Sequence, residues 1–106
     1  MEIEVLPSAK QDLKRARFFY ERQQHGLGKY FFQTLSLEID SLEFFAGIHV
    51  RSGELFRFKS KKFPCLIYYG MTQHIVYVGA VLDARRSPFR IHAREQREQT
   101  RIRLLS

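Results

Sequence analysis

Residues 63–88 read FPCLIYYGMTQHIVYVGAVLDARRSP, and this stretch decides the fold. Two runs rich in aromatic and β-branched residues, 63–71 and 75–82, predict two β-strands. The three residues between them, 72–74, are few enough for a hairpin loop. The second run is apolar at almost every position, which is typical of a strand that is covered on both faces. We therefore expect residues 75–82 to form the central strand of a sheet.

The residues at the other end of the chain predict a short strand and the start of a helix. Residues 3–6 read Ile-Glu-Val-Leu and form a short strand that Pro7 ends, because proline cannot donate to a strand ladder. Ser8, with Gln11 three residues later, has the pattern of a capping box. We therefore expect a first strand over residues 3–6 and a first helix that Ser8 caps.

Two helices are expected to cover the sheet. Apolar residues recur at helical spacing over 9–20 and again over 31–45, and Gly47 ends the second series. Gly26-Leu27-Gly28 is a link short enough to make the two helices an antiparallel hairpin. The apolar side of such a hairpin needs a sheet to cover. The central-strand residues expected beneath it are Val78, Ala80 and Leu82.

One further strand completes the predicted fold. Residues 49–53 are expected to form a loop, and residues 55–59 alternate apolar and basic side chains as a strand does. The element order is then β-α-α-β-β-β. We predict an α+β fold in which an antiparallel helical hairpin packs on a small, mainly antiparallel sheet.

A basic segment follows the central strand. Ser87 and Pro88 allow a helix to begin there, since serine caps helices and proline suits the first helical position. The apolar residues beyond them are too few to hold the far end of that helix. We expect a single domain over residues 1–95 and a loosely held basic C-terminal tail over residues 96–106.

The composition is that of a soluble globular protein with a polyanionic partner. The chain has 106 residues, of which 44% are hydrophobic and 27% charged, enough for one core. Its 18 Lys and Arg outnumber 11 Asp and Glu and give a net charge of +7. Such an excess favours nucleic acid or an acidic protein segment as partner. The composition alone is about as compatible with a solvated basic surface that has no partner. A single cysteine, with no signal peptide and no apolar run of membrane-spanning length, predicts a cytoplasmic protein.

The predicted elements carry residues that resemble the RelE/ParE toxin superfamily. The first half of the resemblance rests on Leu13, Phe19-Tyr20-Glu21 and Gly26-Leu27-Gly28 followed by Phe31 or Phe32. The second half rests on Phe63-Pro64, Ile67-Tyr68, the run from Val78 to Leu82, Arg86-Ser87-Pro88 and Arg94. The order and spacing of these residues carry the resemblance, which covers roughly residues 1–95.

The resemblance implies the toxin half of a type II toxin–antitoxin, or plasmid stabilisation, module. Members share the sheet-and-hairpin fold and are neutralised by a small antitoxin. RelE-like members cleave messenger RNA on the ribosome, whereas characterised ParE-like members poison DNA gyrase. For this chain the resemblance implies a small acidic antitoxin encoded nearby as partner, in a dimer or a heterotetramer.

The positions of RelE-like chemistry hold unsuitable residues in this sequence. In the resemblance, the arginine at the start of the third sheet strand falls on Cys65. The C-terminal Tyr or His falls near Phe89 or Ile91, neither of which can move a proton. We therefore expect a ParE-like toxin that inhibits gyrase by binding and has no catalytic residue.

Two alternatives stay open. One is a ribosome-dependent messenger RNA endonuclease that uses Lys59, Lys61 and Arg86 as phosphate ligands, and the other is a non-toxic remnant that only binds its antitoxin. Phe18 and Phe45 are expected antitoxin contacts, because the helical aromatics cannot all face inward. No metal or cofactor is expected, since the four histidines are scattered along the chain. The expected contacts with the target or with nucleic acid are Arg57, Lys59, Lys61, Lys62, Arg85, Arg86, Arg90 and Arg94.

Overall fold

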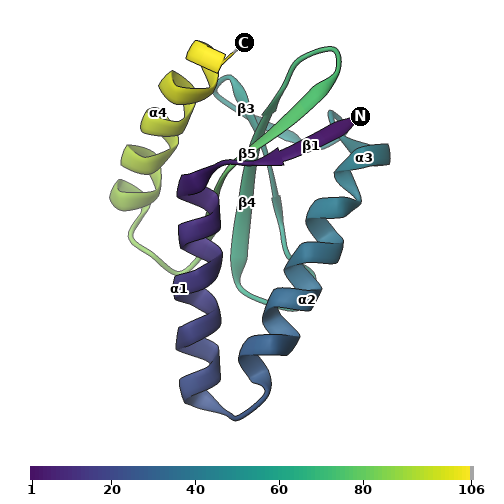
Figure 1. Cartoon of the computed structure of the whole chain (residues 1–106). Coiled ribbons are helices and arrows are strands. Elements are labelled where there is room, and N and C mark those ends of the chain that lie inside the picture. Colours follow the sequence, from purple (N-terminus) through teal and green to yellow (C-terminus); the bar gives the residue numbers. More distant parts are fainter. Residues whose placement is uncertain (106) are drawn as a thin grey trace.

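The predicted hairpin forms the centre of the sheet in a computed structural model of the chain, which describes residues 1–105 (Figure 1). β4 (Cys65–Met71) and β5 (Ile75–Asp83) are antiparallel neighbours in a five-stranded sheet with the order β1-β5-β4-β3-β2. β1 (Glu2–Val5) lies parallel to β5, and β3 (Leu55–Lys59) is antiparallel to β4. The predicted α+β fold with a mainly antiparallel sheet is confirmed.

The segment expected to be a loop over residues 49–53 contains a further strand. β2 (Val50–Ser52) pairs antiparallel with β3 at the edge of the sheet. Only three residues form it, and Val50 and Arg51 are exposed, so the hydrophobic pattern carries no sign of this strand.

A helical hairpin covers one face of the sheet, as predicted. α1 (Pro7–Gln23) and α2 (Leu27–Asp40) lie side by side, and a short α3 (Leu42–Phe45) follows where one longer helix was expected (Figure 1). Gly26 turns the chain between α1 and α2 with φ +86°, a conformation that favours glycine. The backbone N–H groups of Gly26 and Gly28 each donate a hydrogen bond of 3.0 Å to the carboxylate of Glu21.

The start of α1 differs from the prediction. Leu6 occupies the N-cap position and Pro7 begins the helix, so Ser8 is not the cap. Proline suits this position because its fixed φ and missing N–H cost nothing there. The Ser8 hydroxyl instead donates a hydrogen bond of 2.9 Å to the Gly79 carbonyl of β5. Ser8 therefore ties α1 to the central strand.

A bulge at Gly79 changes which residues of β5 face the hairpin. Tyr68 pairs with Ala80 and Tyr69 pairs with Val78, so Gly79 has no opposite residue on β4. Val78 packs in the core beneath α1 and α2, whereas Ala80 lies in the cluster on the opposite face. The prediction that Val78, Ala80 and Leu82 all lie beneath the hairpin is therefore correct for Val78 and wrong for Ala80 and Leu82.

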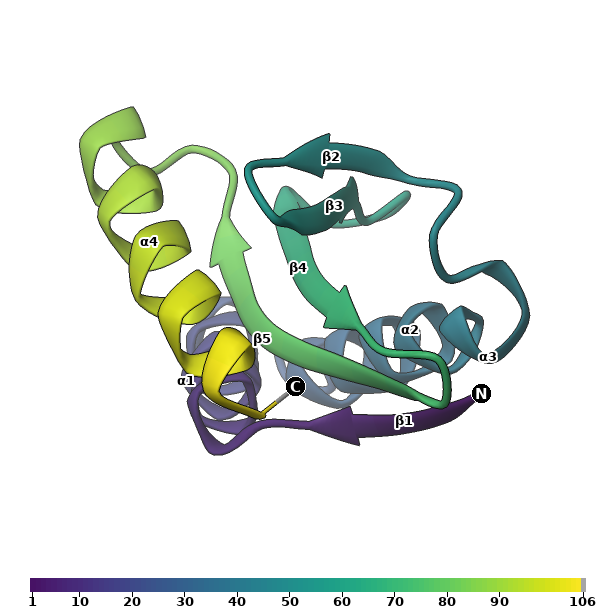
Figure 2. The same cartoon turned by 90° about the horizontal axis from the view of Figure 1, so that it is seen from above.

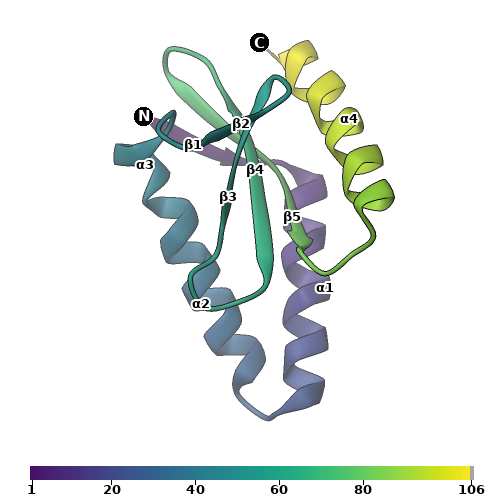
Figure 3. The same ribbon diagram turned by 180° about the vertical axis from the view of Figure 1, so that it is seen from behind.

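The basic segment after β5 is a long helix on the second face of the sheet. α4 (Pro88–Leu105) runs beside β5 and lies across the sheet from the helical hairpin (Figures 2 and 3). Ile102 is buried in a cluster with Leu55, Tyr68 and Leu82. Residues 96–105 of the expected tail continue α4, with Glu98 and Ile102 buried, and the predicted boundary at residue 95 falls inside this helix. Residue 106 of that predicted tail lies outside the described residues.

Candidate partner-binding surfaces

A cleft opens between α1 and the carboxyl end of β5. Its volume is about 440 Å³. Helix α1 supplies one wall, and the ends of β4 and β5 with the following turn supply the other. We call it the arginine cleft, and its lining residues are Asp12, Arg15, Ala16, Phe19, Tyr20, Cys65, Val81, Asp83, Arg85 and Arg86.

The floor of the arginine cleft is apolar and chemically inert. Cys65 and Val81 are buried at its base, and Ala16 and Tyr20 of α1 pack against the same core. Burial raises the pKa of the Cys65 thiol to about 11. Because the thiolate is the nucleophile, a thiol with this pKa is unreactive at neutral pH. The cleft is suited to binding and offers no nucleophile at its base.

The rim of the cleft carries one neutralised and two uncompensated arginines. The Arg85 guanidinium donates two hydrogen bonds to the Asp83 carboxylate, at 3.0 and 2.8 Å, which lower the pKa of Asp83. Within residues 1–105, the exposed side chains of Arg15 and Arg86 make no hydrogen bond and no ion pair. The positive charge available to a partner is therefore that of Arg15 and Arg86.

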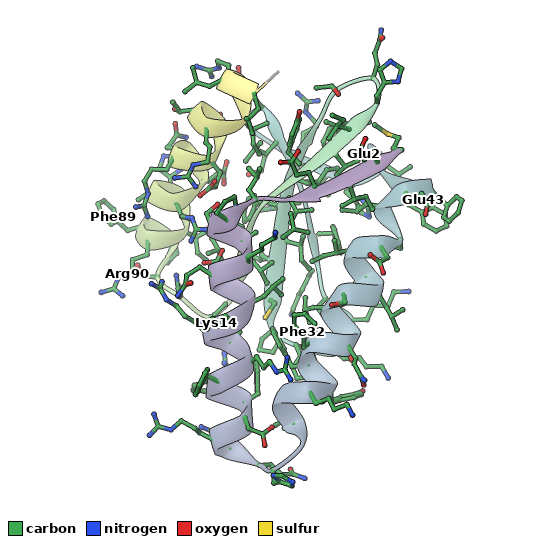
Figure 4. The ribbon with its side chains drawn as sticks, viewed as in Figure 1. Glu2, Lys14, Phe32, Glu43, Phe89 and Arg90 are labelled. Atoms are coloured by element: carbon green, nitrogen blue, oxygen red, sulfur yellow. The ribbon has the colours of Figure 1, made fainter. Side chains whose placement is uncertain are left out.

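The first turn of α4 extends this basic region. Ser87 accepts a hydrogen bond from the Arg90 N–H at 3.2 Å, so serine and proline begin the helix as predicted. Phe89 and Arg90 project outward from this turn (Figure 4), and Phe89 is 83% exposed. Arg85, Arg86 and Arg90, all predicted contact residues, thus lie along the exit from the central strand.

Arg94, predicted as a contact residue, belongs to the interior. Its guanidinium donates to both oxygens of Asp12, at 2.9 and 2.7 Å, and to Glu98 at 2.6 Å. The same Asp12 carboxylate accepts the backbone N–H of Val81 at 3.0 Å. Only 13% of the Arg94 side chain is exposed, and the carboxylates are more deeply buried. The structure therefore places Arg94 where its charge is satisfied within the protein.

The ion pairs of Arg94 extend to a second arginine and to helix α1. Glu98, only 1% exposed, also accepts hydrogen bonds from Ser8 at 3.2 Å and from Arg101 at 3.0 Å. We call Ser8, Asp12, Arg94, Glu98 and Arg101 the buried polar network. It joins α1, β5 and α4, so the arginine cleft and α4 share Asp12 as a common support.

The remaining predicted cations lie on other parts of the surface. A second hollow of about 470 Å³, which we call the apolar groove, lies between α2, α3 and β3. Its lining residues are Leu37, Glu38, Ser41, Phe45, Ile48, His49, Phe58, Lys59 and Lys61. Lys62 lies over the ring of Tyr30 at 5.6 Å, and Arg57 is exposed on β3. The structure therefore places Lys59 and Lys61 in one hollow and Arg86 in another.

The two predicted antitoxin contacts are exposed but separate. Phe45 is 53% exposed in the apolar groove, beside Leu37 and Ile48. Phe18 is 68% exposed on α1, where it lines no part of that groove. Arg15 was not predicted, although Arg15 and Phe19 are four residues apart on α1 and so share a helix face.

The described residues 1–105 contain no group of three His, Cys, Asp or Glu side chains that could hold a metal ion. In the same part of the chain, every helix is too short or too polar to cross a membrane.

Comparison with solved structures places the fold. The chain is similar to a chain of the chromosomal ParDE TA system from P. aeruginosa, with a TM-score of 0.67 over 76% of this chain and 92% of that one. Sequence identity is 11%, so the likeness is one of fold. No protein-family model matches the sequence, and no curated protein matches it. The fold expected from the resemblance is confirmed.

Proposed function

We propose that this protein is the toxin of a type II toxin–antitoxin pair of the ParE-like kind, acting in the cytoplasm. The observation that carries the proposal is the fold, shared with a chain of the chromosomal ParDE TA system from P. aeruginosa. Fold does not fix function by itself, so the surfaces supply the second part of the argument. An exposed arginine region and an apolar groove on a chain of net charge +7 suit a protein that binds other macromolecules.

The proposed target is DNA gyrase, inhibited by binding. A binding mode is supported by the residues at the positions of RelE-like chemistry: Cys65 is buried with a raised pKa, and Phe89 carries no proton to transfer. Arg86 and Arg90 are exposed at the exit from β5 and are the proposed centre of the target contact. The other proposed target contacts are Arg57, Lys59, Lys61, Lys62 and Arg85.

The proposed second partner is a small acidic antitoxin. The apolar groove offers Phe45 beside Leu37, which is 71% exposed, with Lys59 and Lys61 at its margin. An amphipathic acidic segment fits such a combination, because apolar side chains anchor it and carboxylates pair with the lysines.

Controlled expression combined with a supercoiling assay tests the proposal. We expect expression to stop growth and to induce DNA damage, and purified protein to inhibit supercoiling by gyrase. Replacing both Arg86 and Arg90 by alanine should abolish both effects without unfolding the protein, since their side chains are exposed. The matched control replaces Lys29 and Arg97, two exposed basic residues outside the cleft and the groove, and should remain inhibitory.

Other outcomes separate the alternatives. Specific cuts in messenger RNA within the ribosomal A site would replace the gyrase proposal by the endonuclease. Unimpaired growth with a stable antitoxin complex would identify a non-toxic remnant.

A further inference from the structure

The arginine cleft combines an apolar base with two uncompensated charges. Of its charged residues, Asp12 is paired with Arg94 and Asp83 with Arg85. The charge left over is positive, from Arg15 on α1 and Arg86 after β5, on opposite walls of the cleft. A ligand between these walls meets a guanidinium on each side.

The apolar character of the cleft continues outward along α1. Phe19 is 49% exposed at the margin of the cleft. A neighbouring hollow shares Arg15 and Phe19 with the cleft and adds Phe18, Arg22 and Gln23. Two arginines and two phenylalanines of α1 therefore line adjoining hollows. Such a surface complements a chain that carries both carboxylates and apolar side chains.

We propose that the arginine cleft is a docking site for an acidic protein segment that carries an apolar anchor. The anchor packs on Ala16, Phe19 and Val81, and flanking carboxylates pair with Arg15 and Arg86. Guanidinium groups bind carboxylates in two places at once, which fixes the orientation of the segment.

The lining favours a peptide over a nucleic acid. A phosphate backbone is bound through a series of uncompensated cations. The cleft offers two of these, and it places the Asp83 carboxylate among them. Its base, formed with Val81 and Ala16, suits the insertion of one apolar side chain. That the natural occupant is a segment of the acidic antitoxin rests on the proposed function, whereas the binding chemistry does not.

A display library of short random peptides, selected on the full-length protein, tests the site. We expect enriched peptides to carry Asp or Glu next to Phe, Leu or Trp. Synthetic copies should lose affinity by about tenfold or more when Arg15→Glu and Arg86→Glu are combined, since both ion pairs become repulsive. The control pair Lys29→Glu and Arg97→Glu changes net charge equally and should keep the affinity.

The apolar half of the site has its own matched pair of variants. Phe19→Ala removes a wall of the cleft and should weaken binding about tenfold, whereas Phe44→Ala, at a 79% exposed phenylalanine elsewhere, should not. Circular dichroism of each variant establishes that it is folded.

Several results overturn the inference. The first is a library that yields no acidic sequences. The second is an equal loss of peptide affinity in both charge-reversed pairs. The third is a loss of affinity in the Lys29→Glu and Arg97→Glu pair only. Tighter binding of a labelled RNA or DNA oligonucleotide that competes with the peptides would assign the cleft to nucleic acid instead. Peptide binding without growth inhibition would support the docking site and contradict the proposed toxin function. Growth inhibition without peptide binding would support the toxin function and contradict the docking site.

Discussion

The two faces of the sheet are held by different physical means. Beneath the helical hairpin, apolar side chains such as Phe31, Leu35 and Val76 are fully buried. Phe31 belongs to a cluster of aromatic rings, and its ring centroid lies 5.0 Å from that of Phe63. Beneath α4, the apolar cluster is smaller and lies beside the buried carboxylates of the polar network. One face is thus held mainly by apolar packing, and the other combines a small core with ion pairs.

The difference concerns specificity as much as stability. Burying an ion pair costs desolvation that its attraction only partly offsets. Apolar packing stabilises the hairpin face at many positions. The buried polar network fixes α4 in one register, because Arg94 meets Asp12 and Glu98 meets Ser8 only there. Four substitutions, in order of decreasing expected effect, test this distinction.

Phe31→Ala should give the largest loss, on the hairpin face. Phe31 is fully buried and contacts the rings of Tyr20 and Phe63, so truncation leaves a cavity. We expect the free energy of unfolding to fall by about 3–5 kcal/mol in urea titrations. Phe44→Ala, at a 79% exposed position, is the control and should change it by less than about 0.5 kcal/mol. A loss below about 1 kcal/mol for Phe31→Ala would contradict a tightly packed hairpin face.

Arg94→Ala should follow, on the α4 face. The substitution leaves Asp12 buried without its guanidinium and Glu98 with Arg101 alone, and we expect a loss of about 3 kcal/mol. Combining Arg94→Met with Asp12→Asn and Glu98→Gln removes the charges together and should recover part of that loss. If the triple variant is less stable than Arg94→Ala, the network stabilises the fold more than we propose.

Gly70→Ala should have a smaller effect, confined to the contact between β4 and α4. A Cβ at Gly70 would lie 2.7 Å from Cγ2 of Ile102, so the Ile102 side chain or α4 itself must shift. We expect a loss of about 1–3 kcal/mol. Ile102→Ala should relieve the overlap, and the two changes together should cost less than their sum. Additive losses of stability in this double-mutant cycle would show that the overlap with Ile102 does not cause the loss in Gly70→Ala.

Glu21→Gln should give the smallest effect, because this carboxylate is largely exposed at the turn of the hairpin. Hydrogen bonds from the N–H of Gly26 and then of Gly28 lower the pKa of Glu21 below its ordinary value of 4.5. A lowered folded-state pKa means that the stabilisation is complete above the unfolded-state value and is lost as pH falls through the folded-state value. The difference in melting temperature between wild type and Glu21→Gln should therefore be constant near neutral pH and disappear in acid. A difference that persists from about pH 7 to about pH 3 would contradict this.

The sequence predicts the hairpin side of the molecule well and the α4 side poorly, for a physical reason. Apolar periodicity identifies β4, β5, α1 and the start of α2, since those elements bury continuous apolar faces. In α4 the buried positions include Glu95 and Glu98, which the same reasoning assigns to solvent. Ser52, which donates to Glu95, and Ser8, which donates to Glu98, lie far away in the chain, so no local pattern predicts these contacts.

The candidate site follows the same rule. Arg85 and Arg86 are adjacent in the chain at the end of a recognisable strand, so the sequence alone predicts them as surface contact residues. Arg15 lies on the opposite wall of the cleft and becomes their neighbour only when α1 packs against β5. The bulge at Gly79 is equally hidden, because a glycine within a strand does not tell whether the ladder continues past it.

The parallel pairing of β1 with β5 also bears on the order in which the chain can fold during synthesis. β1 leaves the ribosome first, yet its hydrogen-bonding partner strand begins only at Ile75. β2 to β5 form successive antiparallel pairs between near neighbours and can assemble locally. The contact of Arg94 with Asp12 spans 82 positions and closes later still. The two ends of this chain are therefore the last parts to find each other, and until then the nascent protein presents an unpaired edge of its central strand.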